Sequence, residues 1–316
     1  MLKIGIIGLG IISRNHANAI TQNSHIKLVA GADINDEKRQ QFKSEYGIST
    51  YDDYKQMLEC ENLDAVVIAL PHGLHAEVTT HCAAAKVHVL LEKPMANTTQ
   101  ECNEIIKAVE QNNIKFMLAH PQRYFAENIK AKELISSHIL GEPVCITDLR
   151  NLNYFTDSRP SWFSSKALAG GGIVMNYGAH SLDKLTWITD SQITRITGKA
   201  TQFIDGIEVD GNAQIFLEFE SGITANITYC GYNVPPINDT TFYFTNGILK
   251  LGTEVGLWAA IGGGEFETVE ITNRQDPFAL MWDDFITAIQ NDTISPIDAQ
   301  YGLRIIELIE QIYSKN

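Results

Sequence analysis

The stretch Gly8-Leu9-Gly10-Ile11-Ile12-Ser13 directly follows an apolar run at Lys3–Ile7 and opens a helix-like segment. Glycines between a strand and a helix have a physical role, because Gly8 permits a tight turn and Gly10 lets the backbone approach a pyrophosphate at the helix N-terminus. Ser13 stands in place of the third glycine of this pattern, where a small residue is tolerated for helix–strand packing. A glycine-containing turn that binds no nucleotide can have the same sequence pattern, so the residues around it are needed to distinguish the two alternatives.

The first 120 residues alternate between continuous apolar runs of strand length and helix-like stretches. Runs that are apolar throughout are typical of strands covered on both faces, and strict alternation predicts right-handed crossovers in a parallel, doubly wound α/β sheet. The expected strands are Lys3–Ile7, Ile26–Ala32, Ala65–Leu70, Val87–Leu91 and Lys115–Ala119. The expected helices are Ile11–Thr21, Asp36–Tyr46, Leu74–Ala85 and Thr98–Asn112, with a shorter helical turn at Asp52–Leu58.

The pattern changes after residue 120, where β-patterned segments follow one another closely. Ser221-Gly222 and Asn246-Gly247 are hairpin turn signals, which favour a largely antiparallel, open sheet in an α+β domain. The expected strands are Val144–Asn151, Ile193–Thr201, Asn212–Phe219, Ile223–Cys230, Thr240–Phe244, Gly247–Leu251 and Thr268–Ile271, and the expected helices are Ala126–Ser136, Ala179–Thr189, Pro277–Gln290 and Ala299–Tyr313. We therefore expect a first domain over residues 1–120 and a second over residues 121–316.

Composition narrows the class of protein. The length of 316 residues suits two domains, and a net charge of −14 argues against a broad nucleic-acid-binding face, since such faces need clustered Lys and Arg. No apolar run approaches the roughly 18–20 residues that a membrane span requires. The five cysteines are dispersed without a CxxC pair, which predicts reduced thiols in a cytoplasmic protein.

Asp33 ends the second expected strand, 23 residues after Gly10. A carboxylate there can accept hydrogen bonds from an adenosine ribose, and it would repel a 2′-phosphate, so NAD is favoured over NADP. The alternative is a helix N-cap or a turn aspartate.

Two further loops leave the carboxyl ends of later strands, where ligands collect in an open parallel sheet. They are Leu70-Pro71-His72-Gly73-Leu74-His75 and Glu92-Lys93-Pro94. Pro94 fixes the chain beside Lys93, and Glu92 can orient the ammonium, which near a substrate hydroxyl would stabilise a developing alkoxide. A solvated surface lysine is the alternative.

The second domain contains Gly170-Gly171-Gly172, followed four residues later by Asn176 and then by His180. If both are helical they share a face, and the glycines would let the backbone come close to a ligand. Imidazole suits proton transfer with a sugar hydroxyl. The alternative makes Asn176 an N-cap and His180 a hydrogen-bonded core histidine. His72, His75 and His81 have no carboxylate or Cys at ligand spacing, so no metal is expected.

Taken together, these residues resemble the Gfo/Idh/MocA family of glucose–fructose oxidoreductase, inositol dehydrogenase and rhizopine catabolism proteins. The resemblance covers nearly the whole chain and rests on an ordered set of motifs. They are Gly8-x-Gly10-x-x-Ser13 with His16, Pro71-x-x-x-His75, Glu92-Lys93-Pro94, Trp162, and Gly170-Gly171-Gly172 with His180 and Asp183. It implies a Rossmann domain followed by an α/β domain whose open sheet often forms a subunit interface.

The resemblance implies an NAD-dependent oxidoreductase acting on a sugar, cyclitol or related polyol. Lys93 matches the lysine beside nicotinamide and substrate, His180 matches the catalytic histidine, and Asn176 stands where many members carry Asp. Because Asn cannot ionise, it can orient a hydroxyl or the imidazole but cannot stabilise an imidazolium by charge. Expected cofactor contacts are Gly8, Gly10, Ile11, Ile12, Asp33, Leu70, Pro71, His72, His75, Glu92, Lys93 and Pro94, and expected substrate contacts are Lys93, Arg123, Tyr124, Trp162, Asn176 and His180.

Two other functions use the same fold. One is a dinucleotide-binding sensor without turnover, which the presence of both Lys93 and His180 disfavours. The other is a glycosidase that oxidises its substrate transiently and shows no net NADH signal. As partners we expect a small-molecule substrate and a second copy of the chain in a homodimer or homotetramer, with no nucleic acid and no membrane.

Overall fold

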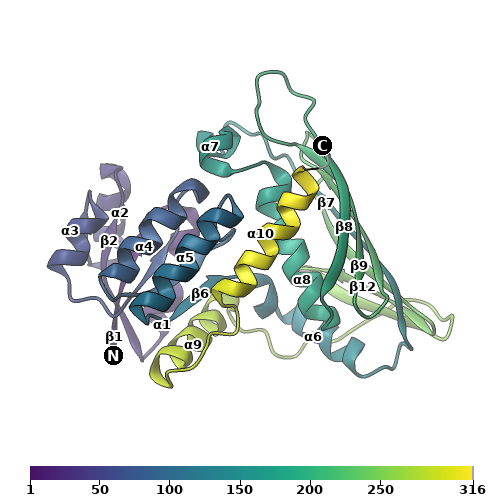
Figure 1. Cartoon of the computed structure of the whole chain (residues 1–316). Coiled ribbons are helices and arrows are strands. Elements are labelled where there is room, and N and C mark those ends of the chain that lie inside the picture. The colour runs from purple at the N-terminus through teal and green to yellow at the C-terminus, as the bar shows by residue number, and fades with distance from the viewer. Residues whose placement is uncertain (315–316) are drawn as a thin grey trace. The chain divides into compact units, whose positions relative to one another are not determined.

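The computed structural model describes residues 1–314, which form two compact units, each built on its own sheet (Figure 1). The first unit comprises Met1–His120 and Phe278–Ile306, and the second comprises Pro121–Pro277 and the residues from Glu307 onward. The last two residues of the expected second domain lie outside the described part of the chain.

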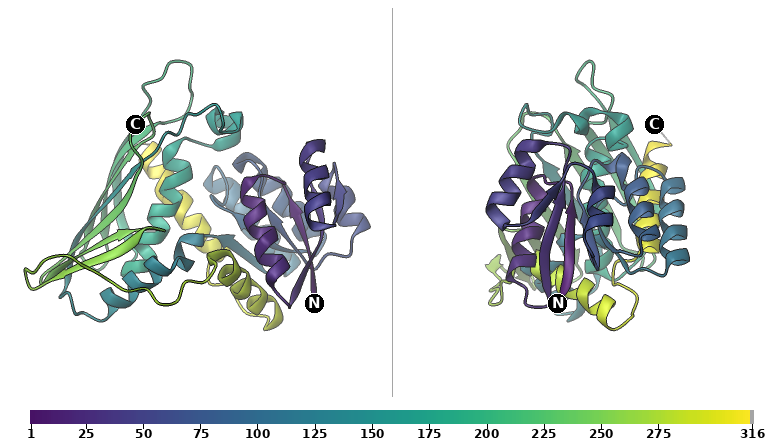
Figure 2. Two further views of the ribbon diagram at one scale, coloured as in Figure 1. Left: turned by 180° about the vertical axis from the view of Figure 1, so that it is seen from behind. Right: turned by 90° about the vertical axis from the view of Figure 1, so that its left-hand side faces the viewer.

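The first unit is a doubly wound sheet of six parallel strands in the order β3-β2-β1-β4-β5-β6, with helices on both faces (Figure 2). Its strands are β1 (Leu2–Ile7), β2 (Ile26–Ala32), β3 (Ser49–Tyr51), β4 (Ala65–Ile68), β5 (His88–Glu92) and β6 (Phe116–Ala119). Its helices are α1 (Ile11–Gln22), α2 (Asp36–Tyr46), α3 (Tyr54–Cys60), η1 (His72–Leu74), α4 (His75–Ala84), α5 (Thr99–Asn112) and α9 (Pro277–Gln290). The parallel sheet is confirmed, and the three-residue strand β3 is an addition to it.

The second unit is an eight-stranded sheet in the order β14-β13-β12-β11-β7-β10-β9-β8, antiparallel except for the pair β7–β10. Its strands are β7 (Pro143–Asn151), β8 (Ile193–Thr201), β9 (Asn212–Phe219), β10 (Thr224–Cys230), β11 (Ile237–Phe244), β12 (Gly247–Gly252), β13 (Gly256–Ile261) and β14 (Glu267–Thr268). Its helices are η2 (Pro121–Tyr124), α6 (Ala126–Ser136), η3 (Ser161–Ser164), α7 (Lys166–Ala169), η4 (Val174–Gly178) and α8 (Ala179–Thr189), and α10 (Ala299–Tyr313) ends in this unit.

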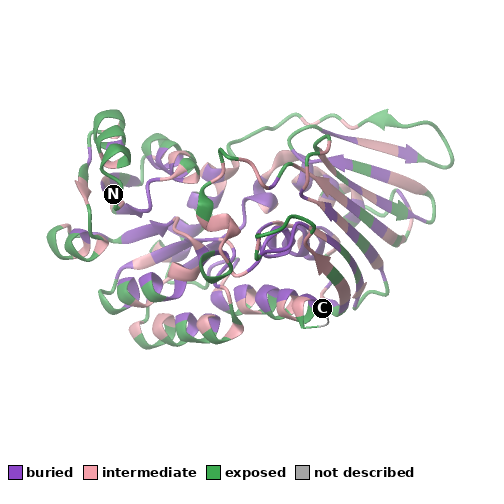
Figure 3. Ribbon diagram, turned by 90° about the horizontal axis from the view of Figure 1, so that it is seen from above, coloured by how far each residue is buried: buried purple, intermediate pink, exposed green. Residues whose placement is uncertain are grey.

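Helices α6 and α8 cover one face of this sheet (Figures 1 and 2). Strands such as β9 and β10 alternate between buried and more exposed residues, whereas the strands of the first unit other than β3 are mostly buried (Figure 3). This difference is what a one-sided and a two-sided sheet require.

Two segments of the second half differ from expectation. The expected strand Thr268–Ile271 is only the exposed two-residue strand β14, and β13 was not expected. Residues Phe278–Ile306 group with the first unit, although we expected them in the second domain. The reason is burial on α1, because the His16 ring lies 5.1 Å from the Phe278 ring and 6.1 Å from the Trp282 ring.

Candidate active site

The two glycines of the turn between β1 and α1 have different roles: the backbone conformation requires a glycine at position 8, and Gly10 leaves open space beside the helix. Gly8 has a φ of +90°, and a Cβ there would lie 2.3 Å from the carbonyl oxygen of Ala69. Gly10 caps α1, and no neighbouring atom lies within 4 Å of the place a Cβ would take. The Ser13 hydroxyl donates to the Gly8 carbonyl, which secures the turn. The open space beside the α1 N-terminus fits a pyrophosphate group.

Asp33 holds this turn in place. Its two carboxylate oxygens accept hydrogen bonds from the backbone N–H groups of Leu9 and Asn35, each at 2.8 Å. Asn35, and not Asp33, caps helix α2, so the helix-cap alternative is wrong, whereas the bond from the Asn35 N–H is the contact expected of a turn aspartate. Each carboxylate oxygen has a second acceptor site, so Asp33 can still accept from the hydroxyls of a ribose. Lys38 places its Nζ 3.6 Å from the same carboxylate.

Two large apolar side chains are exposed near this turn. Ile11 is 83% exposed at the start of α1, and Ile34 is 91% exposed directly after Asp33. The face of a heteroaromatic base would cover such surface. Ile34 was not among the expected contacts, and its position behind the strand-end carboxylate was the available signal. Ile12 is half-buried.

His75 joins the two loops that follow β4 and β5. Its ring is fully buried, with Nδ1 2.9 Å from the Pro94 carbonyl and Nε2 3.0 Å from the Leu70 carbonyl. Burial lowers the pKa of His75, against the opposing effect of these carbonyls, so the neutral ring donates to one carbonyl at a time. His75 therefore supports the loops from beneath. His72 is also buried, with its ring 5.8 Å from that of His75.

Glu92, the neighbour of Lys93, sits in a second buried contact set. The His16 Nε2 lies 2.9 Å from Glu92 Oε1, and Trp282 Nε1 donates to His16 Nδ1 at 3.2 Å. Indole is only a donor, so Nδ1 carries the lone pair and Nε2–H donates to Glu92. Burial raises the pKa of Glu92, but the His16 hydrogen bond and the nearby Lys93 cation outweigh it and lower the pKa below its usual value.

Glu92 is therefore an ionised carboxylate beneath Lys93. Its Oε2 accepts from the Lys93 backbone N–H at 3.2 Å, and the Lys93–Pro94 peptide bond is cis. Lys93 itself is half-buried at the carboxyl end of β5, and Leu70 and Pro71 occupy the matching end of β4. Sequence reasoning placed His16 in a motif but not in the site; its spacing from the glycine turn was the signal.

The second unit brings Asn176 and His180 into one irregular helix. Asn176 is buried within the π-helix η4, and His180 is partly exposed in the first turn of α8. Gly178, not Asn176, occupies the N-cap position of α8, so the capping alternative is wrong. A π turn inside a helix is frequent at functional sites.

The glycines that precede η4 make close contact with protein groups. A Cβ on Gly172 would lie 1.8 Å from the Asp210 carbonyl oxygen, and one on Gly171 would lie 2.1 Å from the Tyr313 hydroxyl. The Asp210 carboxylate accepts from the N–H groups of Gly172 and Val174 at 2.7 and 2.8 Å. The close approach that the glycines permit is thus to Asp210 and Tyr313.

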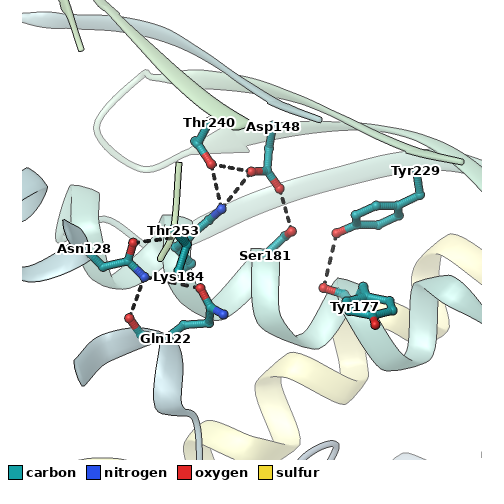
Figure 4. Close-up of polar contacts among 9 residues, drawn as sticks. All are labelled: Gln122, Asn128, Asp148, Tyr177, Ser181, Lys184, Tyr229, Thr240 and Thr253. Atoms are coloured by element: carbon teal, nitrogen blue, oxygen red, sulfur yellow. Dashed lines mark hydrogen bonds and ion pairs between the residues drawn. The ribbon is translucent and has the colours of Figure 1, made fainter. Parts of the chain in front are cut away.

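A buried ion pair fixes α8 to the sheet (Figure 4). Lys184 Nζ lies 2.8 Å from Asp148 Oδ1 and 2.6 Å from the Thr240 hydroxyl, and Ser181 donates to Asp148 Oδ2 at 2.5 Å. Burial alone would raise the pKa of Asp148, but the Lys184 ammonium and the surrounding hydrogen bonds lower it. Ser181 follows His180 directly, so this network sets where the His180 backbone lies.

A second ion pair fixes the other side of α8. Arg123 places Nε and its terminal nitrogen 2.8 and 2.7 Å from Asp183 Oδ1, and Asp183 is fully buried. This pair connects η2 to α8. Tyr124, the next residue of η2, is buried. The expected substrate contacts of Arg123 and Tyr124 remain predictions.

Aromatic side chains surround Asn176. The Tyr177 ring lies 6.2 Å from the His180 ring and 6.1 Å from the Tyr154 ring. Burial raises the pKa of Tyr154, against smaller lowering effects of a nearby arginine cation and of the Asn176 amide. Trp162 stacks on Phe163 with 3.7 Å between ring centroids. Tyr154 is fully buried, so these rings form a packed cluster beside Asn176.

Within residues 1–314, no three or more His, Cys, Asp or Glu side chains are grouped so that they could hold a metal ion. Of the helices described, none has both the length and the apolar character that crossing a membrane would demand.

The chain matches two family models. Residues 2–120 match the model described as the oxidoreductase family with an NAD-binding Rossmann fold, and residues 128–250 match the GFO/IDH/MocA C-terminal domain. The first matched range ends at residue 120, where the first segment of the first unit also ends, and the second range lies within the second unit.

Named relatives are distant in sequence. The 1-carboxy-3-chloro-3,4-dihydroxycyclohexa-1,5-diene dehydrogenase of Comamonas testosteroni is 25% identical over 73% of this chain and 58% of its own length. The rhizopine catabolism protein MocA of Rhizobium meliloti is 25% identical over 74% of this chain and 72% of its own length. The crystal structure of aldose-aldose oxidoreductase from Caulobacter crescentus, complexed with glycerol, is similar with a TM-score of 0.89 and 25% identity, covering 99% of this chain and 96% of that one.

Proposed function

Because this chain belongs to the Gfo/Idh/MocA family of NAD-binding oxidoreductases, we propose that it transfers a hydride between nicotinamide and a secondary hydroxyl or carbonyl carbon of a sugar, cyclitol or related polyol. Relatives support this class of substrate, since their names specify a carboxylated cyclic diol, a rhizopine and aldoses. The single observation that carries the proposal is the buried support of Lys93, in which Glu92, His16 and His75 fix a cation at a strand end.

NAD fits the first unit. The α1 N-terminus beside Gly10 would hold the pyrophosphate, and Asp33 would accept from the adenosine ribose. A 2′-phosphate would meet the Asp33 carboxylate, so NAD is preferred to NADP. NAD, when bound, accepts or supplies the hydride.

Three side chains would act on the substrate. The Lys93 ammonium stabilises the negative charge that develops on the reacting oxygen. His180 removes the hydroxyl proton during oxidation and returns it during reduction. Asn176 cannot ionise, so it orients a hydroxyl through its amide. The same groups serve both directions of reaction.

An absorbance screen for NADH formation tests the proposal across polyols, aldoses and nucleotide-linked sugars, run in parallel with NADP. With a substrate that is turned over, Lys93→Ala and His180→Ala should each lower kcat by about 10²–10⁴-fold. Exposed Lys199→Ala serves as the matched control and should leave kcat unchanged. Near-normal turnover in both site variants would refute the mechanism. Cleavage of a glycoside without net NADH would instead identify the transient-oxidation alternative.

We also propose a cytoplasmic homo-oligomer that pairs through the sheet face opposite α8. Phe216 and Tyr243 lie on that face and are 38% and 36% exposed. The open face of a sheet can pair with the same face of a second copy in a symmetric oligomer. Light scattering should give the mass of a dimer or tetramer, and Phe216→Asp should shift it toward the monomer; a monomeric wild type would contradict the assignment.

A further inference from the structure

Two arginines of the second unit stack on the aromatic side chains around Asn176 and His180. Arg150 lies two residues beyond Asp148 on β7, on the same face of the sheet, and its Cζ is 4.1 Å from the centroid of the Tyr177 ring. Arg159 has its Cζ 4.2 Å from the Tyr154 ring and 4.6 Å from the Phe163 ring. Tyr177 in turn contacts both the His180 ring and the Tyr154 ring.

Neither guanidinium has a carboxylate partner within 4.0 Å among residues 1–314. This differs from two other cations of the second unit, because the buried Lys184 is paired with Asp148 and the half-buried Arg123 with Asp183. Both arginines are half-buried, in a chain with 38 acidic and only 24 basic residues. Leaving a half-buried cation without a counter-charge costs free energy.

Stacking satisfies the faces of a guanidinium but not its edges. The N–H donors lie in the plane of the group, and they match the geometry of carboxylate and phosphate oxygens. Asp148, the nearest acidic residue along β7, already has its charge offset by Lys184. Asp157 lies two residues from Arg159 but is exposed and forms no ion pair with it. An oxyanion from outside the chain would complete both sites.

We propose that Arg150 and Arg159 bind an oxyanion carried by the substrate, so that the substrate is an anionic polyol such as a sugar acid or a sugar phosphate. This inference rests on the proposed function, since it assigns the substrate class of the same site. The carboxylate or phosphate binds the guanidinium edges, and the aromatic faces of Tyr154 and Tyr177 keep the two arginines in place. The reacting hydroxyl then lies at Asn176 and His180.

The test compares substrates that share a skeleton and differ only in charge. Each neutral sugar or cyclitol is measured beside its carboxylate and its phosphate, for example D-glucose, D-glucuronate and D-glucose 6-phosphate. We expect kcat/KM to be at least about 10-fold higher for an anionic member, and the better of the two anions identifies the group that is bound.

Variants assign that preference to the two arginines. Arg150→Gln and Arg159→Gln should each lower kcat/KM for the anionic substrate by about 10- to 100-fold, mainly by raising KM. The ratio kcat/KM for the neutral analogue should stay the same. Arg195→Gln is the matched control, because Arg195 is exposed on β8 and pairs with Glu218. Circular dichroism confirms folding, and Arg159→Gln, which lies in a loop, keeps the test valid if Arg150→Gln does not fold.

Binding separates this inference from the proposed function. If neutral members react as well as anions, and the variants lose activity equally on both, the arginines only brace aromatic rings and the anion site is refuted while the oxidoreductase stands. If no compound reacts, the proposed function fails. Calorimetric binding of glucuronate or glucose 6-phosphate that Arg150→Gln abolishes would still support the anion site, and absence of binding would refute it.

Discussion

Replacing Lys184 by methionine removes the counter-charge of a buried carboxylate. The side chains of Asp148 and Lys184 are 3% and 5% exposed and lie 2.8 Å apart, so water cannot replace the lost ammonium. Breaking a buried pair on one side costs about 3–5 kcal/mol. Because Ser181 and Lys184 both contact Asp148, the loss also loosens the helix that carries His180.

Urea unfolding followed by tryptophan fluorescence measures this cost, since Trp162, Trp187 and Trp258 lie in the second unit. The double variant Asp148→Asn/Lys184→Met should recover most of the loss, and Arg195→Met at an exposed pair should cost less than about 1 kcal/mol. The pKa of native Asp148 is lowered, so the ion pair stabilises the fold above the usual Asp pKa, and this stabilisation is lost as the pH falls. The difference in unfolding free energy between the wild type and Lys184→Met should therefore become smaller at acidic pH. A deficit below about 1 kcal/mol at neutral pH would refute the reasoning.

Three further perturbations act on the first unit. Gly10→Ala should weaken NAD binding at least about 10-fold in a fluorescence titration, because the new methyl group would occupy the space proposed for the pyrophosphate. The free energy of unfolding should change by less than about 0.5 kcal/mol, because no protein atom lies within 4 Å of that methyl group. Unchanged affinity for NAD would contradict the pyrophosphate site. Gly8→Ala should cost about 2–4 kcal/mol, from a positive φ and the Ala69 carbonyl, and an unchanged urea midpoint would show that the turn relaxes. The pKa of buried His75 is lowered, so below about pH 6.5 the unfolded chain takes up a proton on this residue and the native chain does not. As the pH is lowered, the melting temperature of the wild type should therefore fall more steeply than that of His75→Gln. Melting temperatures that fall in parallel would contradict this.

Most elements could be predicted because their residues repeat with a clear period. Helices such as α2, α6 and α8 have the bounds that the sequence indicated, and the strand-end positions of Asp33 and Lys93 followed from the βα alternation. The strand β13 was missed because its sequence, GLWAAI, does not alternate between polar and apolar residues. Strand β14 is shorter than expected and lies exposed at the edge of the sheet.

Partner choice was the part that local sequence could not supply. The contact of His16 with Glu92 joins residues 76 apart, and the tautomer of His16 depends on Trp282, which comes 266 residues later. The glycines before Asn176 read as space for a ligand, whereas their neighbours are Asp210 and Tyr313 from distant segments. Nor does composition reveal that Arg150 and Arg159 have no carboxylate within ion-pair distance among residues 1–314, since that depends on how the chain folds, which also pairs Lys184 with Asp148 and Arg123 with Asp183.

Isotope transfer measures the proposed reaction most directly. Reduced NAD in which both hydrogens at C4 of the nicotinamide are deuterium is incubated with the oxidised form of a substrate found in the screen, and the alcohol product is analysed by mass spectrometry. Direct hydride transfer predicts one deuterium on the new carbinol carbon, and about 10²–10⁴-fold less of this labelled alcohol from Lys93→Ala or His180→Ala within the same time. Alcohol formed at the wild-type rate without deuterium would show that the hydrogen comes from elsewhere and would contradict the proposed chemistry.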